Sequence, residues 1–320
     1  MSSSNICVYC KTPNNSIELY KTFDIFDNNY TINKCNVCNA RFLSPNPTPE
    51  QLEQAYSDSY YGEKEEKFEG ITEKILDYFR KKRAHLIASL TEQNGNILDI
   101  GCGNGRFLKY TLLYGNFNLY GIEMPGHSAD RASRIKEINL KIGQLTDNDF
   151  PDNYFDSITL FHVFEHLSEP ASTLNIISKI LKSGGVCVMS FPNIDSLQAN
   201  VFKGKWLHLD PPRHLFYFTP TDFKNIVKNY GFEIEKTSYI STEQNPYGMI
   251  QSILNKFSKK REILFESMKG NSQYIKDVSK TTLFIHSLFF KLSFPLFAFT
   301  DILEAKLKKG ATVQFVLRKK

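Results

Sequence analysis

Residues 97–105 read Ile-Leu-Asp-Ile-Gly-Cys-Gly-Asn-Gly, and this stretch decides the fold. An apolar run over residues 96–100 passes directly into three closely spaced glycines, Gly101, Gly103 and Gly105. Residues 106–114 follow with the apolar spacing of a helix. Glycine lets the backbone turn tightly and lets a ligand approach the main chain, so the stretch predicts a strand, a ligand-binding turn and a helix.

The alternation of strand and helix continues on both sides of this turn. We expect further strands at 118–123, 140–142, 155–163, 185–191, 232–240 and 311–317, and helices at 50–61, 71–90, 128–138, 172–181 and from Thr219 onward. Strands that alternate with helices are typical of an α/β fold with a parallel sheet covered on both faces.

Two acidic residues indicate which ligand the glycine turn binds. Glu123 ends the next strand, where a carboxylate can accept both hydroxyls of a ribose. Asp99 lies two residues before the first glycine, and a carboxylate there disfavours a pyrophosphate but favours an amino group. S-adenosylmethionine has a ribose, an amino-acid end and no phosphate. A nicotinamide cofactor is disfavoured by Asp99 and by the glycine spacing.

Together these motifs resemble those of class I S-adenosylmethionine-dependent methyltransferases. The matching positions are the glycine turn, Glu123, Phe155-Asp156, His162-Val163-Phe164-Glu165-His166-Leu167 and Leu181-Lys182-Ser183-Gly184-Gly185. The match covers residues 70–240 and the final strand. The resemblance implies a Rossmann-like, doubly wound sheet of seven strands whose last strand is antiparallel.

The resemblance also implies roles for individual residues of a cofactor site. The methionine end would be shaped by Asp99, Gly101 and Gly103, with Gly105 in the same turn; Glu123 would hold the ribose, and Gln144 and Leu145 would lie near the adenine. This chain departs from the common pattern after Glu123, where residues 124–127 read Met-Pro-Gly-His instead of beginning with Ser-Pro.

A second motif lies near the amino terminus, where two C-x-x-C pairs are formed by Cys7 and Cys10 and by Cys35 and Cys38. Such pairs place four thiolates around one tetrahedral zinc ion and leave no open position, so we expect structural zinc. Reduced, buried cysteines are the alternative. A zinc module over residues 1–44 ahead of this core resembles methyltransferases of sugar and polysaccharide biosynthesis, and also some that act on ribosomal RNA.

Histidine and glutamate side chains follow the fourth strand of the core, at the edge where open α/β sheets bind ligands. His162, Glu165 and His166 are candidates for the base that accepts a proton from the substrate. If the segment after Val163 is helical, His162 and His166 lie on one face. His214, in a Pro-Pro-Arg-His-Leu stretch, is a further candidate. The alternative for these histidines is packing or capping of local turns.

The sequence divides the chain into four predicted parts. We expect the zinc module at 1–44, a linker and helical lid at 45–95, the core at 96–241 plus 311–320, and a helical insert at 242–310. In the lid, Tyr60 and Tyr61 are candidates to close over the cofactor, and ordinary aromatic packing is equally open.

The insert is rich in phenylalanine between Leu283 and Phe299. His286, Lys291 and Pro295 interrupt this apolar stretch, so we do not expect it to span a membrane. A lid over the core and peripheral membrane contact through residues 283–309 both stay open. The chain has no signal-peptide pattern, so we expect it in the cytoplasm, with membrane association if the insert contacts lipid.

The expected function is methyl transfer from S-adenosylmethionine to a sugar hydroxyl or sugar carbon, on a nucleotide sugar or a lipid-linked glycan. The alternatives are O-methylation of a small phenolic or quinone-type acceptor, RNA methylation, and a non-catalytic binding module. The net charge of +5 is small, and Leu160-Phe161-His162-Val163 replaces the Asn-Pro-Pro-Phe of many base-methylating enzymes. We therefore expect a small-molecule or glycan acceptor and no nucleic-acid partner.

Overall fold

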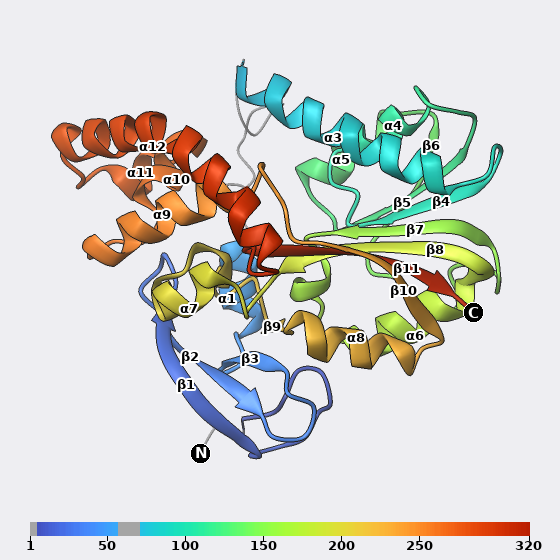
Figure 1. Cartoon of the computed structure of the whole chain (residues 1–320), viewed down its shortest axis with the longest axis horizontal. Helices are drawn as coiled ribbons and strands as arrows, with labels where there is room; N and C mark the ends of the chain where they lie inside the picture. Colours follow the sequence, from blue (N-terminus) through green and yellow to red (C-terminus); the bar gives the residue numbers. More distant parts are fainter. Residues whose placement is uncertain (1–4, 57–70) are drawn as a thin grey trace. The chain divides into compact units, whose positions relative to one another are not determined.

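A computed structural model of the chain describes residues 5–56 and 71–320 (Figure 1). Tyr60 and Tyr61 lie outside the described residues. The chain divides into two compact units. The first comprises Met1–Gly62, Pro192–Phe223 and Ser238–Val313, and the second comprises Glu63–Phe191, Lys224–Thr237 and Gln314–Lys320. We call them the cysteine unit and the glycine-turn unit, after the motifs that they contain.

The glycine-turn unit is built on a seven-stranded sheet in the order β10-β11-β8-β7-β4-β5-β6. The strands are β4 (Asn96–Ile100), β5 (Asn118–Glu123), β6 (Ile138–Ile142), β7 (Phe155–Phe161), β8 (Leu181–Pro192), β10 (Phe232–Ser238) and β11 (Thr312–Lys319). Neighbours from β8 to β6 pair in parallel, and the last strand is antiparallel. The predicted fold class is therefore confirmed.

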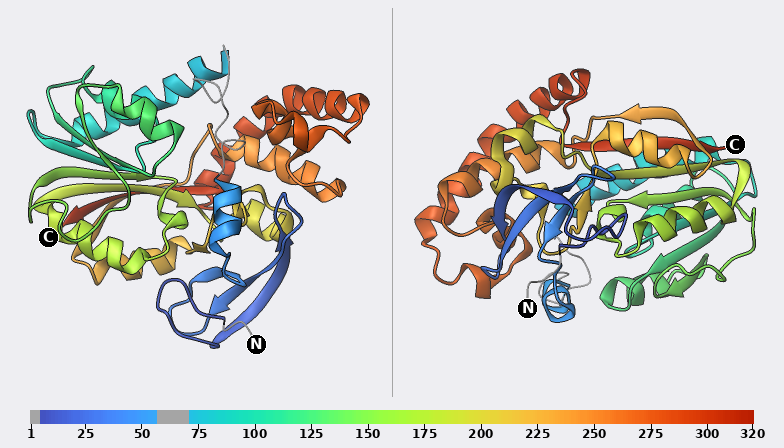
Figure 2. Two further views of the ribbon diagram at one scale, coloured as in Figure 1. Left: turned by 180° about the vertical axis from the view of Figure 1, so that it is seen from behind. Right: turned by 90° about the horizontal axis from the view of Figure 1, so that it is seen from below.

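Helices cover both faces of this sheet, as Figures 1 and 2 show. One face carries α3 (Ile71–Leu90), α4 (Arg106–Thr111) and α5 (His127–Ser133), and the other carries α6 (Pro170–Ile180) and α8 (Pro220–Lys228). The core under α3 and α4 packs Ile87 and Leu108 against strand residues such as Ile97 and Val188, all without solvent exposure. Burial of these side chains supplies most of the driving force that fixes the layers.

The predicted end of the helix over residues 128–138 is wrong. A helix was expected over residues 128–138, but α5 ends at Ser133 and Ile138 is the first residue of β6. Ile138 pairs with Leu119 of β5 and lies against the glycine turn, since a Cβ atom at Gly105 would come 2.8 Å from its Cδ1. Apolar spacing alone does not separate the end of a helix from the start of a buried strand.

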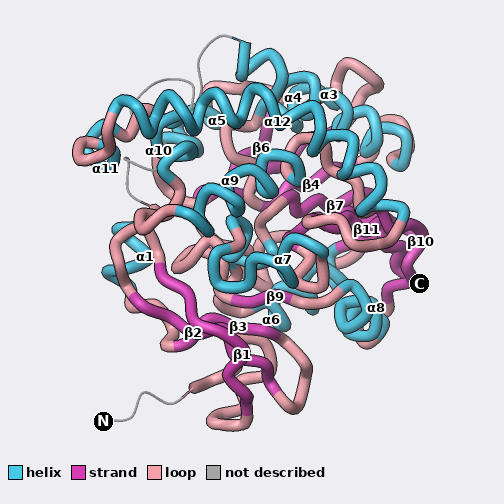
Figure 3. Tube along the Cα trace, turned by 60° about the vertical axis from the view of Figure 1, so that its left-hand side comes forward, coloured by secondary structure: helices cyan, strands magenta, loops and turns pink. Residues whose placement is uncertain are grey.

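The cysteine unit contains a four-stranded antiparallel sheet in the order β1-β2-β3-β9, drawn in Figure 3. Its strands are β1 (Ser16–Phe23), β2 (Asn29–Cys35), β3 (Arg41–Ser44) and β9 (Phe216–Tyr217). β9 comes from a distant part of the chain and pairs Phe216 with Phe42. The helix α1 (Pro49–Ala55) follows this sheet, with a capping box formed by Thr48 and Gln51.

The rest of the cysteine unit is helical. It contains α7 (Leu197–Phe202), the 3-10 turns η2 (Lys203–Lys205) and η3 (Leu207–Leu209), α9 (Asn245–Phe257), α10 (Ile263–Lys269), α11 (Ser272–Ile275) and α12 (Lys280–Lys306). Pro295 lies inside α12 and does not end it. Among the described residues, α12 is the one helix that is long and apolar enough to cross a membrane, by length and composition alone. Those two criteria do not decide whether α12 crosses a membrane, so the expectation that it does not stays a prediction.

Candidate functional site

The glycine turn closes directly on the end of β4. Gly101 and Cys102 both donate their backbone N–H groups to the carbonyl oxygen of Ile122, at 2.8 and 3.0 Å. Gly101 has a φ of +73°, and a Cβ atom there would collide with Val163, so this position requires glycine. Gly103 has a φ of +58°, and a Cβ atom there would meet nothing within 4 Å. The turn therefore leaves open space beside the main chain at Gly103.

The Glu123 carboxylate lies at this open turn. Its Oε2 atom accepts the N–H of Gly103 at 2.6 Å, and its Oε1 atom accepts the N–H of Met124 at 3.1 Å. Burial raises the pKa of Glu123 above its usual value. The backbone of Gly143 donates to the Glu123 carbonyl at 2.8 Å, which places the exposed Gln144 and the half-buried Leu145 at the same edge of the sheet.

Asp99 lies inside the sheet at the end of β4, where its side chain is 4% exposed. Burial and, to a smaller extent, the charge of Glu123 raise the pKa of Asp99 to about 7, although a hydrogen bond from Thr159 opposes the shift. Thr159 Oγ1 donates to Asp99 Oδ1 at 2.6 Å. Thr159 was not among the predicted site residues. Its place between the apolar Ile158 and Leu160 was the available signal, but only the pairing of β7 with β4 identifies its partner.

These residues fit S-adenosylmethionine on the chemistry of the groups present. Asp99 and Glu123 offer two carboxylates to one turn, and Gly103 leaves space for a ligand to approach the backbone. Carboxylates suit ribose hydroxyls and a cationic amino-acid end, but they repel phosphate. The structure thus brings together Asp99, the three glycines, Glu123, Gln144 and Leu145 at the carboxyl edge of β4, β5 and β6.

The residues after β7 differ from the helical arrangement that we considered. His162 has a φ of +56°, in the left-handed region that non-glycine residues rarely adopt, and only a 3-10 turn, η1 (Phe164–His166), follows. His162 and His166 therefore do not share a helical face. Instead, Nδ1 of His162 lies 3.5 Å from Oε1 of Glu165. Glu165 is 2% exposed and lies behind His162, whose side chain is 26% exposed.

His162 is also tied to the glycine turn through its neighbours in the chain. Its backbone N–H donates to the Ser190 carbonyl at 2.9 Å, and the next residue, Val163, is the side chain that contacts Gly101. The partly exposed imidazole of His162 is therefore held at the edge where the glycine turn opens. Of the predicted candidates after β7, Glu165 is buried, whereas His162 and His166 are both partly exposed, and their catalytic roles stay a prediction.

His214 belongs to the cysteine unit, where it is buried. Its Nδ1 atom lies 2.9 Å from the His208 carbonyl oxygen, and its Nε2 atom lies 3.7 Å from an Asp210 oxygen. Asp210 also forms an ion pair with the buried Arg213. Within its own unit, His214 thus has the contacts of a residue that supports a loop, and its catalytic role stays a prediction.

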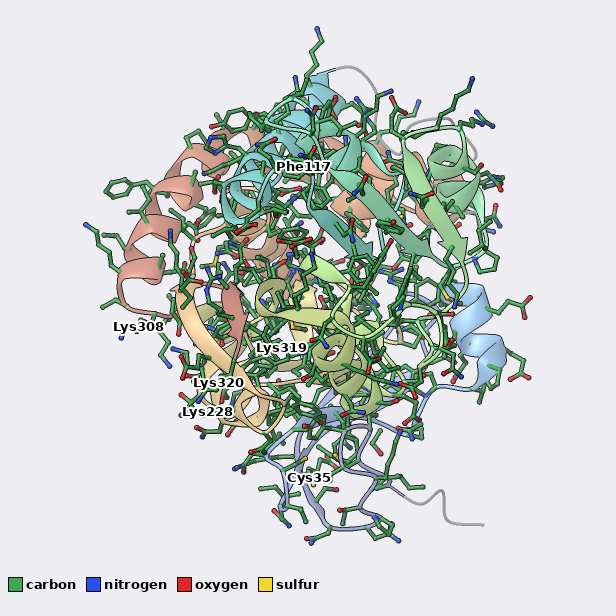
Figure 4. All side chains as sticks on the ribbon, turned by 90° about the vertical axis from the view of Figure 1, so that its right-hand side faces the viewer. Cys35, Phe117, Lys228, Lys308, Lys319 and Lys320 are labelled. Atoms are coloured by element: carbon green, nitrogen blue, oxygen red, sulfur yellow. The ribbon has the colours of Figure 1, made fainter. Side chains whose placement is uncertain are left out.

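The four cysteines of the amino-terminal motif converge. Their Sγ atoms lie within 4.8 Å of one another, with Cys7 to Cys38 at 3.5 Å and Cys10 to Cys35 at 3.6 Å. Cys35, labelled in Figure 4, is fully buried at the end of β2. Four sulfurs at about 2.3 Å from a tetrahedral zinc ion would lie about 3.8 Å apart, so this cluster fits zinc.

Comparison with known proteins agrees with this site. Residues 72–237, slightly more than half of the chain, match the family model described as a methyltransferase domain. The chain therefore belongs to this family. It has the domain of a class I methyltransferase, as the sequence predicted.

Two curated relatives show how far the similarity extends. A ubiquinone biosynthesis O-methyltransferase of Actinobacillus pleuropneumoniae is 30% identical over 128 residues, covering 37% of this chain and 52% of the relative. A demethylmenaquinone methyltransferase of Symbiobacterium thermophilum is 27% identical over 150 residues, covering 43% and 59%. The matching region thus spans about half the length of the curated relatives.

A solved structure supports the fold. The structure of a candidate sarcosine dimethylglycine methyltransferase from Galdieria sulphuraria superposes with a TM-score of 0.51 at 16% identity, over 83% of this chain and 97% of that chain. At this identity the similarity concerns the fold alone.

Proposed function

We propose that this chain transfers a methyl group from S-adenosylmethionine to a hydroxyl oxygen of its acceptor. The observation that carries this proposal is the pairing of His162 with the buried Glu165 beside the glycine turn. A hydroxyl must lose its proton as it becomes a nucleophile, and an imidazole at the ligand-binding edge can accept that proton. A carboxylate behind the imidazole orients it and stabilises its charged form.

The chain's own residues have three tasks in this reaction. When bound, S-adenosylmethionine supplies a methyl carbon that is displaced from its positively charged sulfur, which keeps the electron pair of the broken bond. Asp99 and Glu123 hold the cofactor, so that the acceptor oxygen can bond to the methyl carbon in line. His162 takes the acceptor proton at Nε2, because Nδ1 faces Glu165. Correct alignment alone contributes on the order of 7–11 kcal/mol to such reactions.

For the acceptor, we propose first a sugar hydroxyl, with a sugar carbon as the related choice, on a nucleotide sugar or a lipid-linked glycan. The support is the combination of a four-cysteine module with this core, which resembles sugar and polysaccharide methyltransferases. On this proposal zinc is bound by Cys7, Cys10, Cys35 and Cys38 and is structural, since four protein ligands leave no open coordination position.

A second acceptor class is supported by a separate observation. Several curated relatives are named as ubiquinone biosynthesis O-methyltransferases, and one as a demethylmenaquinone methyltransferase. We therefore propose a phenolic or quinol hydroxyl as the second candidate. A phenol, with a pKa near 10, releases its proton to histidine more readily than a sugar alcohol does.

Methyl-labelled S-adenosylmethionine distinguishes these acceptors. The full-length protein is incubated with the label and with cell extract, and nucleotide sugars, lipid-linked glycans, quinone precursors and RNA are then separated. We expect label in a sugar or glycan fraction. Label in quinone precursors supports the second candidate, and label in RNA contradicts both. Cofactor binding without transfer to any fraction favours a non-catalytic binding module.

Substitutions then test the proposed base. We expect His162→Asn to lower kcat by about a hundredfold or more. Glu165→Gln removes the charge behind the imidazole, and we expect it to lower kcat about tenfold while the KM for S-adenosylmethionine is unchanged. His85→Ala is the matched control, because His85 is an exposed histidine on α3 whose ring contacts Tyr114. Full activity of His162→Asn would refute the assignment.

A further inference from the structure

The helix α12 exposes an apolar stripe along its whole length. The large apolar side chains that are at least two-fifths exposed on it and just after it are Phe284, Ile285, Leu288, Leu292, Leu296, Phe299, Ile302, Leu303 and Leu307. Their spacing of three and four residues places them on one face of the helix. A helix of 27 residues is about 40 Å long, so the stripe is a continuous apolar surface of that length.

The opposite face of α12 is the one that packs, and it carries polar groups. The fully buried residues of the helix are His286, Asp301 and Glu304. Asp301 accepts hydrogen bonds from the side chain of Asn245 at 2.6 Å and from the backbone of Ser241 at 3.1 Å. These contacts fix the rotation of α12 about its axis, because turning the helix would leave a buried carboxylate without its donors.

Aromatic contacts on the same face bind α12 to its neighbours within the cysteine unit. The ring of Phe290 lies 6.0 Å from that of Tyr247 on α9. It also lies 5.5 Å from the ring of Phe294, one turn further along α12 itself. Figures 1 and 3 show α9 and α10 along this side of α12. The amphipathicity of α12 is therefore inverted, since a helix on the surface of a water-soluble protein packs its apolar face and exposes its polar face.

Exposure of such an apolar stripe to water is unfavourable in free energy. Transfer of apolar surface out of water contributes about 25 cal/mol per Å², and monomeric proteins rarely expose contiguous apolar patches of this kind. In the most apolar 18-residue window of α12, 11% of the residues are buried. The stripe therefore indicates that an apolar medium or partner covers this face.

The charges of α12 indicate which kind of partner covers the apolar stripe. Its exposed charged residues are Lys280, Lys291 and Lys306, and the exposed Lys308 follows the helix. Figure 4 labels Lys308 just beyond the last turn. The acidic residues of α12, Asp301 and Glu304, are both buried. All the ionisable groups that α12 presents to its surroundings are thus cationic, which complements an anionic surface.

We propose that α12 lies flat in the interfacial layer of an anionic lipid membrane, with its apolar stripe among the acyl chains and its lysines at the headgroups. Exposed Lys291 lies near the middle of the helix, and Asp301 and Glu304 lie on the packed face. A spanning helix would carry these charges into the hydrocarbon, whereas a helix parallel to the surface keeps the lysines at the headgroups. A second copy of the chain fits less well, because a symmetric dimer would bring the same lysines together.

This inference goes beyond the proposed methyl transfer and does not depend on it, because its evidence is the exposed face of α12. If it holds, the cysteine unit anchors the chain at a membrane surface. The acceptors that such a protein meets there are ones that carry a lipid anchor. Membrane docking and methyl transfer are measured separately, so that failure of one does not decide the other.

The test is vesicle flotation of the purified full-length protein. We expect it to float with phosphatidylcholine vesicles that contain phosphatidylglycerol, and to bind more weakly to phosphatidylcholine alone or at high salt. Leu292→Glu places a charge in the centre of the stripe, at a side chain that is 72% exposed. We expect it to weaken partitioning about tenfold, and the double variant Leu292→Glu, Phe299→Glu to abolish it.

The matched control is Leu113→Glu, because Leu113 is 63% exposed but lies after α4 in the glycine-turn unit. We expect this variant to float like the wild type. Thermal unfolding of each variant checks that the fold is intact, and exposed positions make loss of folding a small risk.

Four results would overturn the proposal. The first is the absence of wild-type flotation with either vesicle. The second is equal flotation of Leu292→Glu and the wild type. The third is a concentration-dependent dimer that Leu292→Glu dissociates, which would assign the stripe to a second copy. Resistance of vesicle-bound protein to alkaline extraction would also contradict it, because that result indicates a spanning helix.

Discussion

At the scale of single residues, Asp99 combines a cost to stability with a proposed role in the cofactor site. Its carboxyl group is buried in the sheet and accepts a hydrogen bond from Thr159. Burial raises its pKa to about 7, so the folded chain holds this proton at a pH where the unfolded chain has released it. Stability therefore falls as the pH rises from about 4, and the full penalty is present above about 7.

Asp99→Asn tests both the stability cost of the buried carboxyl group and its proposed role in binding the cofactor. The amide stays neutral, so we expect its stability advantage over the wild type to grow by about 2 kcal/mol between pH 5 and pH 8. The same change removes a negative charge near the amino-acid end of the cofactor, so we expect at least tenfold weaker binding of S-adenosylmethionine at pH 8. Urea unfolding at both pH values and calorimetric titration measure the two effects. A stability difference that is independent of pH would contradict the burial argument.

At the scale of elements, the four-cysteine cluster and β9 together hold the small sheet of the cysteine unit. Cys35 ends β2, and the short β3 that follows pairs with β9. Arg41 of β3 also forms an ion pair with Asp222 at 2.7 Å. Residues of the sheet such as Ile32 and Leu43 pack in one buried cluster with Trp206. A closed metal site at the end of β2 would add to the stability of the folded sheet.

Zinc removal should therefore loosen this sheet. We expect about one zinc ion per chain, and we expect chelation or Cys35→Ser to lower the Tm by about 5 °C or more. Cys187→Ala is the control, since Cys187 is buried in β8 and lies outside the cluster. It should retain the zinc. Zinc content equal to that of the wild type in Cys35→Ser would contradict the assignment of the four ligands.

At the scale of the whole molecule, the insert between β10 and β11 belongs to the cysteine unit, although these strands lie in the sheet of the glycine-turn unit. The end of the insert is held by Asn193, whose side chain donates to the Gly310 carbonyl at 3.0 Å and whose backbone donates to Ala311 at 2.8 Å. Gly310 passes so close to the Tyr239 carbonyl that a Cβ atom would collide with it. The chain thus enters and leaves the insert at one point.

The division of the chain into two units predicts which residues the cofactor protects from hydrogen exchange. Hydrogen exchange with and without S-adenosylmethionine should show slower exchange at residues 101–105, 123–126 and 143–145. We expect residues 16–44 of the cysteine unit to be unchanged. Glu123→Gln should weaken the protection, because it removes the charge proposed to hold the ribose. Protection confined to the cysteine unit would contradict the placement of the cofactor at the glycine turn.

The sequence by itself determined the features that depend on local spacing. Residues 97–105 and the alternating apolar runs predicted the class of the fold, and two C-x-x-C pairs predicted the cysteine cluster. These patterns are readable because periodicity, glycine and cysteine spacing constrain the backbone over a few residues. The roles of Asp99 and Glu123 in holding the cofactor came from the resemblance to methyltransferases and stay a prediction.

Only the tertiary structure decided which distant residues meet. The pairing of β7 with β4 brings Thr159 to Asp99, and β9 joins β3 across more than 170 residues of chain. His162 has a left-handed backbone conformation, so the residues after β7 do not form the helical face that was considered. His162 is paired with Glu165 instead. The apolar pattern of α12 does not tell which face is packed. The buried Asp301 decided that, because long-range hydrogen bonds and packing, rather than local preference, set how a helix is rotated.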